Sequence, residues 1–98
     1  MSASPRVGTA TVPRLARGVR LQFSEPRGQW IVQAPERVLM PDEIAVAVLQ
    51  RCDGEVDVGR IAAALAEAYQ APLDVVTTDI VEMLQDLVDK GVVEDADG

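Results

Sequence analysis

The apolar residues of this 98-residue chain change their spacing once, at Pro41, and this change limits the possible folds more than any other feature. Before Pro41, apolar and polar residues alternate along Val19–Ser24, which is the two-residue period of a half-buried strand. After Pro41, apolar residues recur every three to four positions, as on one face of an amphipathic helix. We therefore predict an α+β domain with a winged-helix-like order, in which a three-stranded antiparallel sheet packs on three helices.

Proline and glycine residues mark the ends of the predicted elements. Pro26 and Gly28 place a turn between Val19–Ser24 and the β-branched segment Gln29–Ala34, so these two segments form a hairpin. The next segment, Arg37–Met40, is short and has a proline on each side, which is typical of an edge strand. The three predicted helices span residues 42–52, 58–70 and 73–90, with Asp57 as an N-cap and Gly91 closing the last helix.

Both ends of the chain lack a periodic apolar pattern. We predict a disordered arm at residues 1–13, one folded domain at residues 14–93 and an acidic tail at residues 94–98. Deleting residues 1–11 is then expected to leave the fold and ligand affinity unchanged. The first thirteen residues also lack the apolar core of a secretory signal, and no apolar run approaches the roughly 20 residues of a membrane span. We accordingly expect a cytoplasmic protein in which Cys52 stays reduced.

The charge of the chain is divided between its two halves. Residues 1–40 carry six arginines and two glutamates, whereas residues 41–98 carry three basic and fourteen acidic residues. The predicted third helix is acidic, with one lysine among five carboxylates. A helix that reads DNA needs several basic residues against the phosphates, so DNA binding is disfavoured despite the winged-helix order.

The residue types exclude most catalytic chemistry. The chain has no histidine and one cysteine, which removes histidine-assisted nucleophiles and histidine or cysteine metal sites. We predict no enzyme activity, no cofactor and no metal, and we interpret Cys52 as a small buried hydrophobic residue. The carboxylates Asp79, Glu82 and Asp86 share one helix face and are interpreted as solvated. Trp30 is predicted to pack in the core unless Arg27 stacks on it.

The predicted third helix has a wider apolar face than one core contact requires. Its apolar positions are Val76, Ile80, Val81, Met83, Leu84, Leu87 and Val88. Two interpretations stay open at this point. The other helices cover this face from both sides, or part of it lines a groove beside the third strand in which an incoming peptide would bind.

Between Pro13 and Val93 the sequence resembles the PqqD family of pyrroloquinoline quinone biosynthesis. The matching motifs occur in order at Pro13–Leu21, Arg27–Trp30, Ala34–Val38, Asp42–Ala45, Leu49–Gly54, Leu84–Leu87 and Lys90–Gly91. The pair Met40–Pro41 departs from the polar helix cap expected in this family and leaves the start of the first helix open. The resemblance implies a precursor-recognition domain for ribosomally made peptides, which acts as a peptide chaperone without catalysis of its own.

The resemblance also implies partners and a binding mode. The precursor peptide PqqA would add as a strand beside the predicted third strand, and the domain would deliver it to the radical S-adenosylmethionine enzyme PqqE. The implied peptide-binding residues are Glu36, Arg37, Val38, Leu39, Met40, Val76, Ile80, Met83 and Leu87. Our prediction for the enzyme-docking surface is the basic set Arg14, Arg17, Arg20 and Arg27. The alternative function is a winged-helix interaction module with an unrelated partner.

Overall fold

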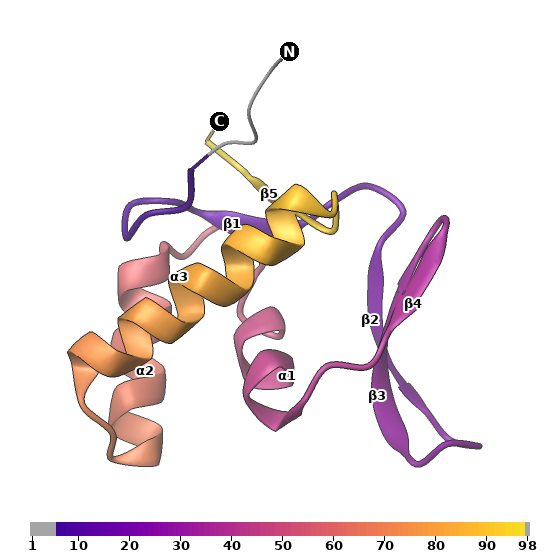
Figure 1. The fold of residues 1–98 in the computed structure, drawn as a ribbon, viewed down its shortest axis with the longest axis horizontal. Coiled ribbons are helices and arrows are strands. Elements are labelled where there is room, and N and C mark those ends of the chain that lie inside the picture. The colour runs from indigo at the N-terminus through magenta and orange to yellow at the C-terminus, as the bar shows by residue number, and fades with distance from the viewer. Residues whose placement is uncertain (1–5, 98) are drawn as a thin grey trace.

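The computed structural model describes residues 6–97 and confirms the predicted α+β class (Figure 1). Its elements are β1 (Pro13–Leu15), β2 (Arg20–Ser24), β3 (Gln29–Ala34), β4 (Arg37–Leu39), α1 (Glu43–Leu49), α2 (Val58–Tyr69), α3 (Leu73–Asp89) and β5 (Val93–Asp95). Strands β2, β3 and β4 form one antiparallel sheet in that order, and β1 pairs with β5. In the view of Figure 1, α1 lies between this sheet and the pair of α2 and α3. No helix within residues 6–97 is long and apolar enough to cross a membrane.

The register of the sheet decides which side of β4 faces the core. Val32 of β3 pairs with Leu39 of β4, and both side chains pack in or against the buried cluster. Val38 therefore points to the opposite face, where its side chain is 48% exposed. The sequence left this choice of face open because either alternate pair of residues in the strand could point inward.

The helix ends follow from local hydrogen bonds. Asp42 and Asp57 are the N-caps of α1 and α2, and each carboxylate accepts an N–H three residues later at 2.8 Å. The prediction for Asp57 is thereby confirmed, and the start of the first helix is fixed. At the end of α3, Val92 N–H donates to the carbonyl of Leu87 at 2.8 Å, and Gly91 takes a φ of 76°. This is the Schellman arrangement, in which glycine occupies the left-handed position.

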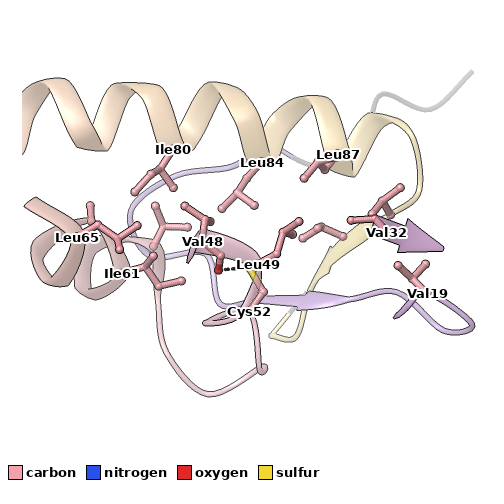
Figure 2. Packing of buried hydrophobic residues seen from close by; sticks show 14 residues of the cluster. Val19, Val32, Val48, Leu49, Cys52, Ile61, Leu65, Ile80, Leu84 and Leu87 are labelled. Atoms are coloured by element: carbon pink, nitrogen blue, oxygen red, sulfur yellow. Dashed lines mark hydrogen bonds between the residues drawn. The ribbon is translucent and has the colours of Figure 1, made fainter. Parts of the chain in front are cut away.

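The core joins all three helices to the inner face of the sheet. Ile80, Leu84 and Leu87 point from α3 toward Val48 and Leu49 of α1 (Figure 2). Val32 supplies the contribution of β3, and Ile61 and Leu65 supply that of α2. Cys52 is buried in the same cluster, as predicted, and its thiol donates to the carbonyl of Val48 at 3.3 Å.

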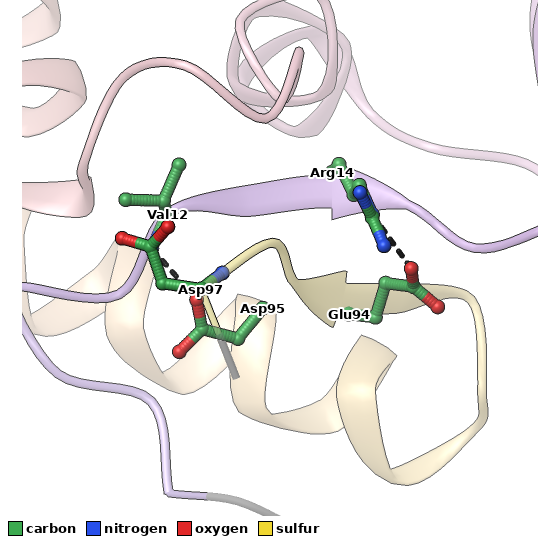
Figure 3. Close-up of polar contacts among 5 residues, drawn as sticks. All are labelled: Val12, Arg14, Glu94, Asp95 and Asp97. Atoms are coloured by element: carbon green, nitrogen blue, oxygen red, sulfur yellow. Dashed lines mark hydrogen bonds and ion pairs between the residues drawn. The ribbon is translucent and has the colours of Figure 1, made fainter.

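The predicted disordered arm is wrong for residues 6–13, and the predicted acidic tail is wrong for most of its length. Thr11 is 8% exposed, and β1 pairs with β5 through Pro13↔Asp95, so these two segments near the ends of the described chain belong to the folded domain. Arg14 Nε donates to Glu94 Oε2 at 2.6 Å across this pair of strands (Figure 3). The physical reason is backbone pairing, which needs no periodic apolar pattern. Residues 1–5 and 98 of the predicted arm and tail lie outside the described part.

The prediction that Trp30 packs in the core is also wrong. Its side chain is half-buried and meets the exposed ring of Phe23 edge-on, with ring centroids 5.7 Å apart and an interplanar angle of 75°. The two residues face each other across β2 and β3 near the hairpin turn. This end of the hairpin extends beyond the buried cluster, which contains neither residue, so the aromatic pair remains at the surface.

Candidate functional site

Strand β4 has one unpaired edge within the described part of the chain. It pairs only with β3, after a loop of two residues, Pro35 and Glu36. In such a turn the N–H of Arg37 points back to the carbonyl of Ala34. Because antiparallel pairs alternate, the N–H and C=O of Val38 then point away from β3. The outer edge of β4 is thus free to accept another strand at Val38 and at the residues just beyond each end of β4.

A hollow of about 250 Å³, here called the helix pocket, lies among the three helices. Its lining comes from Ile44, Leu65, Tyr69, Ala71, Val75, Val76, Asp79, Ile80 and Met83. Three of these residues, Ile44, Tyr69 and Val75, are large hydrophobic side chains that remain exposed. Asp79 is the one carboxylate in the lining. The pocket can therefore hold an apolar side chain and can attract a positive charge at its rim.

The four residues predicted on α3 separate into two groups. Val76, Ile80 and Met83 line the helix pocket, and Val76 and Met83 are half-buried at its wall. Leu87 does not line the pocket and is buried in the core cluster, as is Ile80 at the pocket floor. Leu87 is therefore not accessible in the conformation described, and its assignment to a peptide-binding surface stays a prediction from the sequence. A single helix stripe cannot show which of its turns the rest of the domain covers.

The five residues predicted around β4 are accessible but do not line the helix pocket. Glu36, Arg37, Val38 and Met40 are exposed, while Leu39 is half-buried. Leu39 and Met83 both pack against the same core cluster, which relates the strand to α3. The chain then reaches Ile44, in the first turn of α1, four residues after Met40. The strand edge and the pocket are thus linked along the chain by the few residues that lead from β4 into α1.

Sequence reasoning missed six of the nine lining residues of the pocket, including its three exposed large hydrophobic residues, Ile44, Tyr69 and Val75. The spacing of Ile44 and Tyr69 matches that of the core residues on their helices, so their sequence positions alone indicate burial. An available signal was position, because Ile44 and Val75 lie in the first turns of their helices and Tyr69 ends α2.

The four arginines predicted to dock an enzyme are spread over the fold. Arg14 is paired with Glu94 on β5. Arg20 begins β2, whereas Arg27 lies in the hairpin turn at the opposite end of that strand. A five-residue strand is about 17 Å long, so these side chains do not form one compact basic patch. Docking at this set remains a prediction from the sequence.

The described residues offer little for chemistry of their own. Among residues 6–97 there is no group of three or more His, Cys, Asp or Glu side chains that could hold a metal ion. Burial, and to a lesser extent the charge of Asp53, raises the pKa of the Cys52 thiol from 9.0 to about 12. A thiol with so high a pKa is a poor nucleophile at neutral pH. The notable features are instead a free strand edge and an apolar pocket.

Comparison with known proteins gives the class of domain. The structure matches the solution NMR structure of the PqqD truncation of Methylobacterium extorquens PqqCD, described as a stand-alone RiPP (ribosomally synthesized and post-translationally modified peptide) recognition element. That match has a TM-score of 0.78 and 43% identity, and covers 90% of this chain and 94% of the other. The crystal structure of PqqD from Xanthomonas campestris matches with a TM-score of 0.54 and 39% identity, over 86% and 93% of the two chains. The chain therefore has the fold of a RiPP recognition element.

Sequence comparison identifies the family. Residues 29–93 match the family model of coenzyme PQQ synthesis protein D. A PqqA binding protein of Bradyrhizobium diazoefficiens is 50% identical over 97 residues, which cover 96% of this chain and 94% of the relative. A PqqA binding protein of Rhodopseudomonas palustris is 51% identical over 90 residues, covering 92% and 88%. The chain belongs to the PqqD family, as its sequence motifs predicted.

Proposed function

We propose that this protein binds the PQQ precursor peptide PqqA by strand addition at β4 and presents it to the radical S-adenosylmethionine enzyme PqqE. Relatives of nearly the same length are PqqA binding proteins, which supports the peptide as the ligand. The observation that carries the binding mode is the free outer edge of β4 at Val38, linked along the chain by the start of α1 to an apolar pocket. The protein acts by binding alone, in the cytoplasm.

The proposed mode accounts for a transient complex. Each new backbone hydrogen bond contributes about 0.5–1.5 kcal/mol net, and four or five of them fit the length of β4 and its flanks. One or two apolar side chains of the peptide in the helix pocket contribute further binding free energy. The ordering of a flexible peptide subtracts from the total, which leaves an affinity of roughly micromolar or somewhat tighter. Such a complex releases its peptide fast enough for delivery.

Among the described residues the sheet has a second unpaired edge, at β2, and this is the main rival within the fold. The β2 edge is bordered by polar side chains, because Arg20 and Gln22 are exposed and Gln22 bonds Gln33 at 2.8 Å. The β4 edge leads directly into the helix that lines the apolar pocket. The β4 edge is therefore our choice, since it offers backbone partners and leads into the apolar helix pocket.

Amide hydrogen exchange measured by NMR, with and without synthetic PqqA, tests the strand addition. The N–H of Val38 is expected to exchange quickly in the free protein and at least tenfold more slowly in the complex. The N–H of Leu39, already turned toward β3, is the internal control and is expected to change much less. Protection along β2 instead would place the peptide on the other edge. Changes in the chemical shifts of Ile44 and Val75 without slower exchange of the Val38 N–H would show that the peptide binds through side chains alone, without strand addition.

Presentation to the enzyme requires that the peptide and PqqE occupy separate surfaces. The expected result is a ternary complex in which PqqE binds this protein with the peptide still protected at Val38. Competition between the peptide and the enzyme would contradict the presentation step and leave peptide binding intact. Absence of any exchange protection or shift with PqqA would favour the alternative function, an interaction module with an unrelated partner.

A further inference from the structure

A second hollow, here called the hairpin pocket, lies between the β2–β3 hairpin and α1. It measures about 290 Å³ and is lined by Phe23, Gly28, Gln29, Trp30, Pro41, Glu43 and Val46. None of these residues lines the helix pocket. The strand residues of β4 do not line it either. The proposed peptide site leaves this hollow without a role.

Helix α1 separates the two pockets. Glu43 and Val46 are three residues apart and share one face of α1, which looks toward the hairpin. Ile44 is rotated by about 100° from Glu43 and looks toward α2 and α3. In Figure 1, α1 stands between the sheet and the other two helices. A ligand in one pocket therefore does not need to displace a ligand in the other.

The lining of the hairpin pocket combines aromatic rings with a carboxylate. Phe23 and Trp30 meet edge-on at a centroid distance of 5.7 Å, and the ring of Phe23 is 48% exposed. Glu43 is exposed, and no hydrogen bond or ion pair engages its carboxylate in the structure described. The neighbouring carboxylate of Asp42 is different, because it accepts the N–H of Ala45 as the helix cap.

This combination fits a basic side chain. The guanidinium of arginine stacks on an aromatic face, and the methylene stem of arginine or lysine packs along apolar surface such as Pro41 and Val46. The charged end then reaches a carboxylate, here Glu43. A neutral apolar side chain would leave the carboxylate without a partner.

We propose that the hairpin pocket is the docking point for an arginine or lysine side chain presented by the modifying enzyme, on the face of α1 opposite the helix pocket. This inference rests on the presentation step proposed above. It replaces the dispersed set Arg14, Arg17, Arg20 and Arg27 with one site of opposite charge. The hairpin provides an aromatic pair, exposed Phe23 and half-buried Trp30, and aromatic residues such as tryptophan contribute much of the binding energy at protein interfaces.

Trp30 is the one tryptophan in the chain, so it reports on this pocket alone. Protein labelled with 5-fluorotryptophan gives a single fluorine resonance, which is followed by NMR while unlabelled PqqE is added. The resonance is expected to shift or broaden with PqqE and to stay within its free linewidth when PqqA alone is added. A resonance that does not respond at a PqqE concentration that saturates the protein would overturn the inference and leave presentation standing.

Substitutions at Glu43 test the basic occupant. Glu43→Gln is expected to weaken PqqE binding at least fivefold and Glu43→Lys further, with PqqA affinity within twofold of wild type. Glu67→Gln removes one charge from an exposed helical position outside the pocket and is expected to bind PqqE as wild type does. Equal binding by wild type and Glu43→Gln would overturn the proposal. If PqqE does not bind the wild type at all, the presentation step fails together with this inference.

Arg27 lies beside Gly28 in the hairpin turn and is a possible occupant from within the chain. The substitution Arg27→Gln distinguishes an occupant supplied by Arg27 itself from one supplied by a partner. If a partner supplies the basic group, the fluorine resonance of the free protein stays unchanged and PqqE binds at least as tightly. A shift in the free protein with no change in PqqE binding would assign the pocket to Arg27 and overturn docking there.

Discussion

The backbone N–H of Val58 donates to the carbonyl oxygen of Thr11 at 2.8 Å, which ties the start of the chain to the first turn of α2. Gly59 N–H likewise donates to the carbonyl of Thr9 at 2.9 Å. The first N–H groups of a helix have no partner within the helix, and Asp57 satisfies one further donor with its side chain. The N-terminal segment therefore completes the cap of α2.

Deleting residues 1–11 is expected to destabilise the domain by about 2–4 kcal/mol, because two helix amides lose their partners and the buried Thr11 is removed. Urea unfolding followed by circular dichroism measures this loss. Deleting residues 1–5 is the matched control and should change stability by less than about 0.5 kcal/mol. Equal stability of the two truncated forms would show that the Thr9 and Thr11 contacts contribute nothing.

The end of α2 supplies a second prediction. Gln70 adopts left-handed φ and ψ angles of 52° and 47°, and Ala71 N–H donates to the carbonyl of Ala66 at 2.9 Å. Glycine adopts this conformation more readily, so Gln70→Gly is expected to stabilise the protein by about 0.5–1 kcal/mol. Gly91→Ala, at φ 76° and with nothing within 4 Å of the added methyl carbon, should destabilise it by a similar amount. Thermal unfolding of both variants checks the opposite signs.

Local patterns predicted much of the fold but not the role of the chain ends. The change of period at Pro41, the hairpin turn and the cap at Asp57 are all visible within a few residues of sequence. The pairing of Pro13 with Asp95 joins segments 82 positions apart through backbone groups that every residue carries. No side-chain pattern encodes such a pairing, and the residues 6–12 lack strand periodicity. The sequence therefore suggested disorder there.

The candidate site shows a similar division. The proline-flanked segment Arg37–Met40 was expected to be an edge strand, and the structure places β4, Arg37–Leu39, at the edge of its sheet. The spacing of apolar residues also predicted the apolar stripe on α3. Which turns of this helix are buried, however, depends on how α1 and α2 pack against it. Leu87 is buried for this reason, while Ile44 at the start of α1 is open to the helix pocket. Tertiary packing decides whether an apolar helix residue is buried like Leu87 or open like Ile44. The residues next to it in the sequence do not show which.

Ile44 gives the third prediction, for peptide binding. Its side chain is 45% exposed in the helix pocket, so Ile44→Asp adds a charge where an apolar anchor is expected without opening the core. PqqA affinity should fall about tenfold, which corresponds to about 1.4 kcal/mol, with little change in stability. Leu73→Asp is the matched control, since Leu73 is 52% exposed at the start of α3 and does not line the pocket. Isothermal titration calorimetry compares them, and equal losses would remove the pocket from the peptide site.

The last prediction concerns Cys52 and alkaline pH. Burial raises the pKa of its thiol from 9.0 to about 12, so the folded protein holds the thiol proton more tightly than the unfolded chain does. The resulting contribution to stability is complete below pH 9 and is lost as the pH rises from 9 toward 12, by about 1.4 kcal/mol per pH unit. Other groups also titrate in this range, so the measurement is the difference in urea unfolding free energy between wild type and Cys52→Ala. That difference should shrink by about 1–2 kcal/mol between pH 8 and pH 10.5. A constant difference would mean that the thiol ionises equally well in both states, and hence that its burial beside Val48 does not control its pKa.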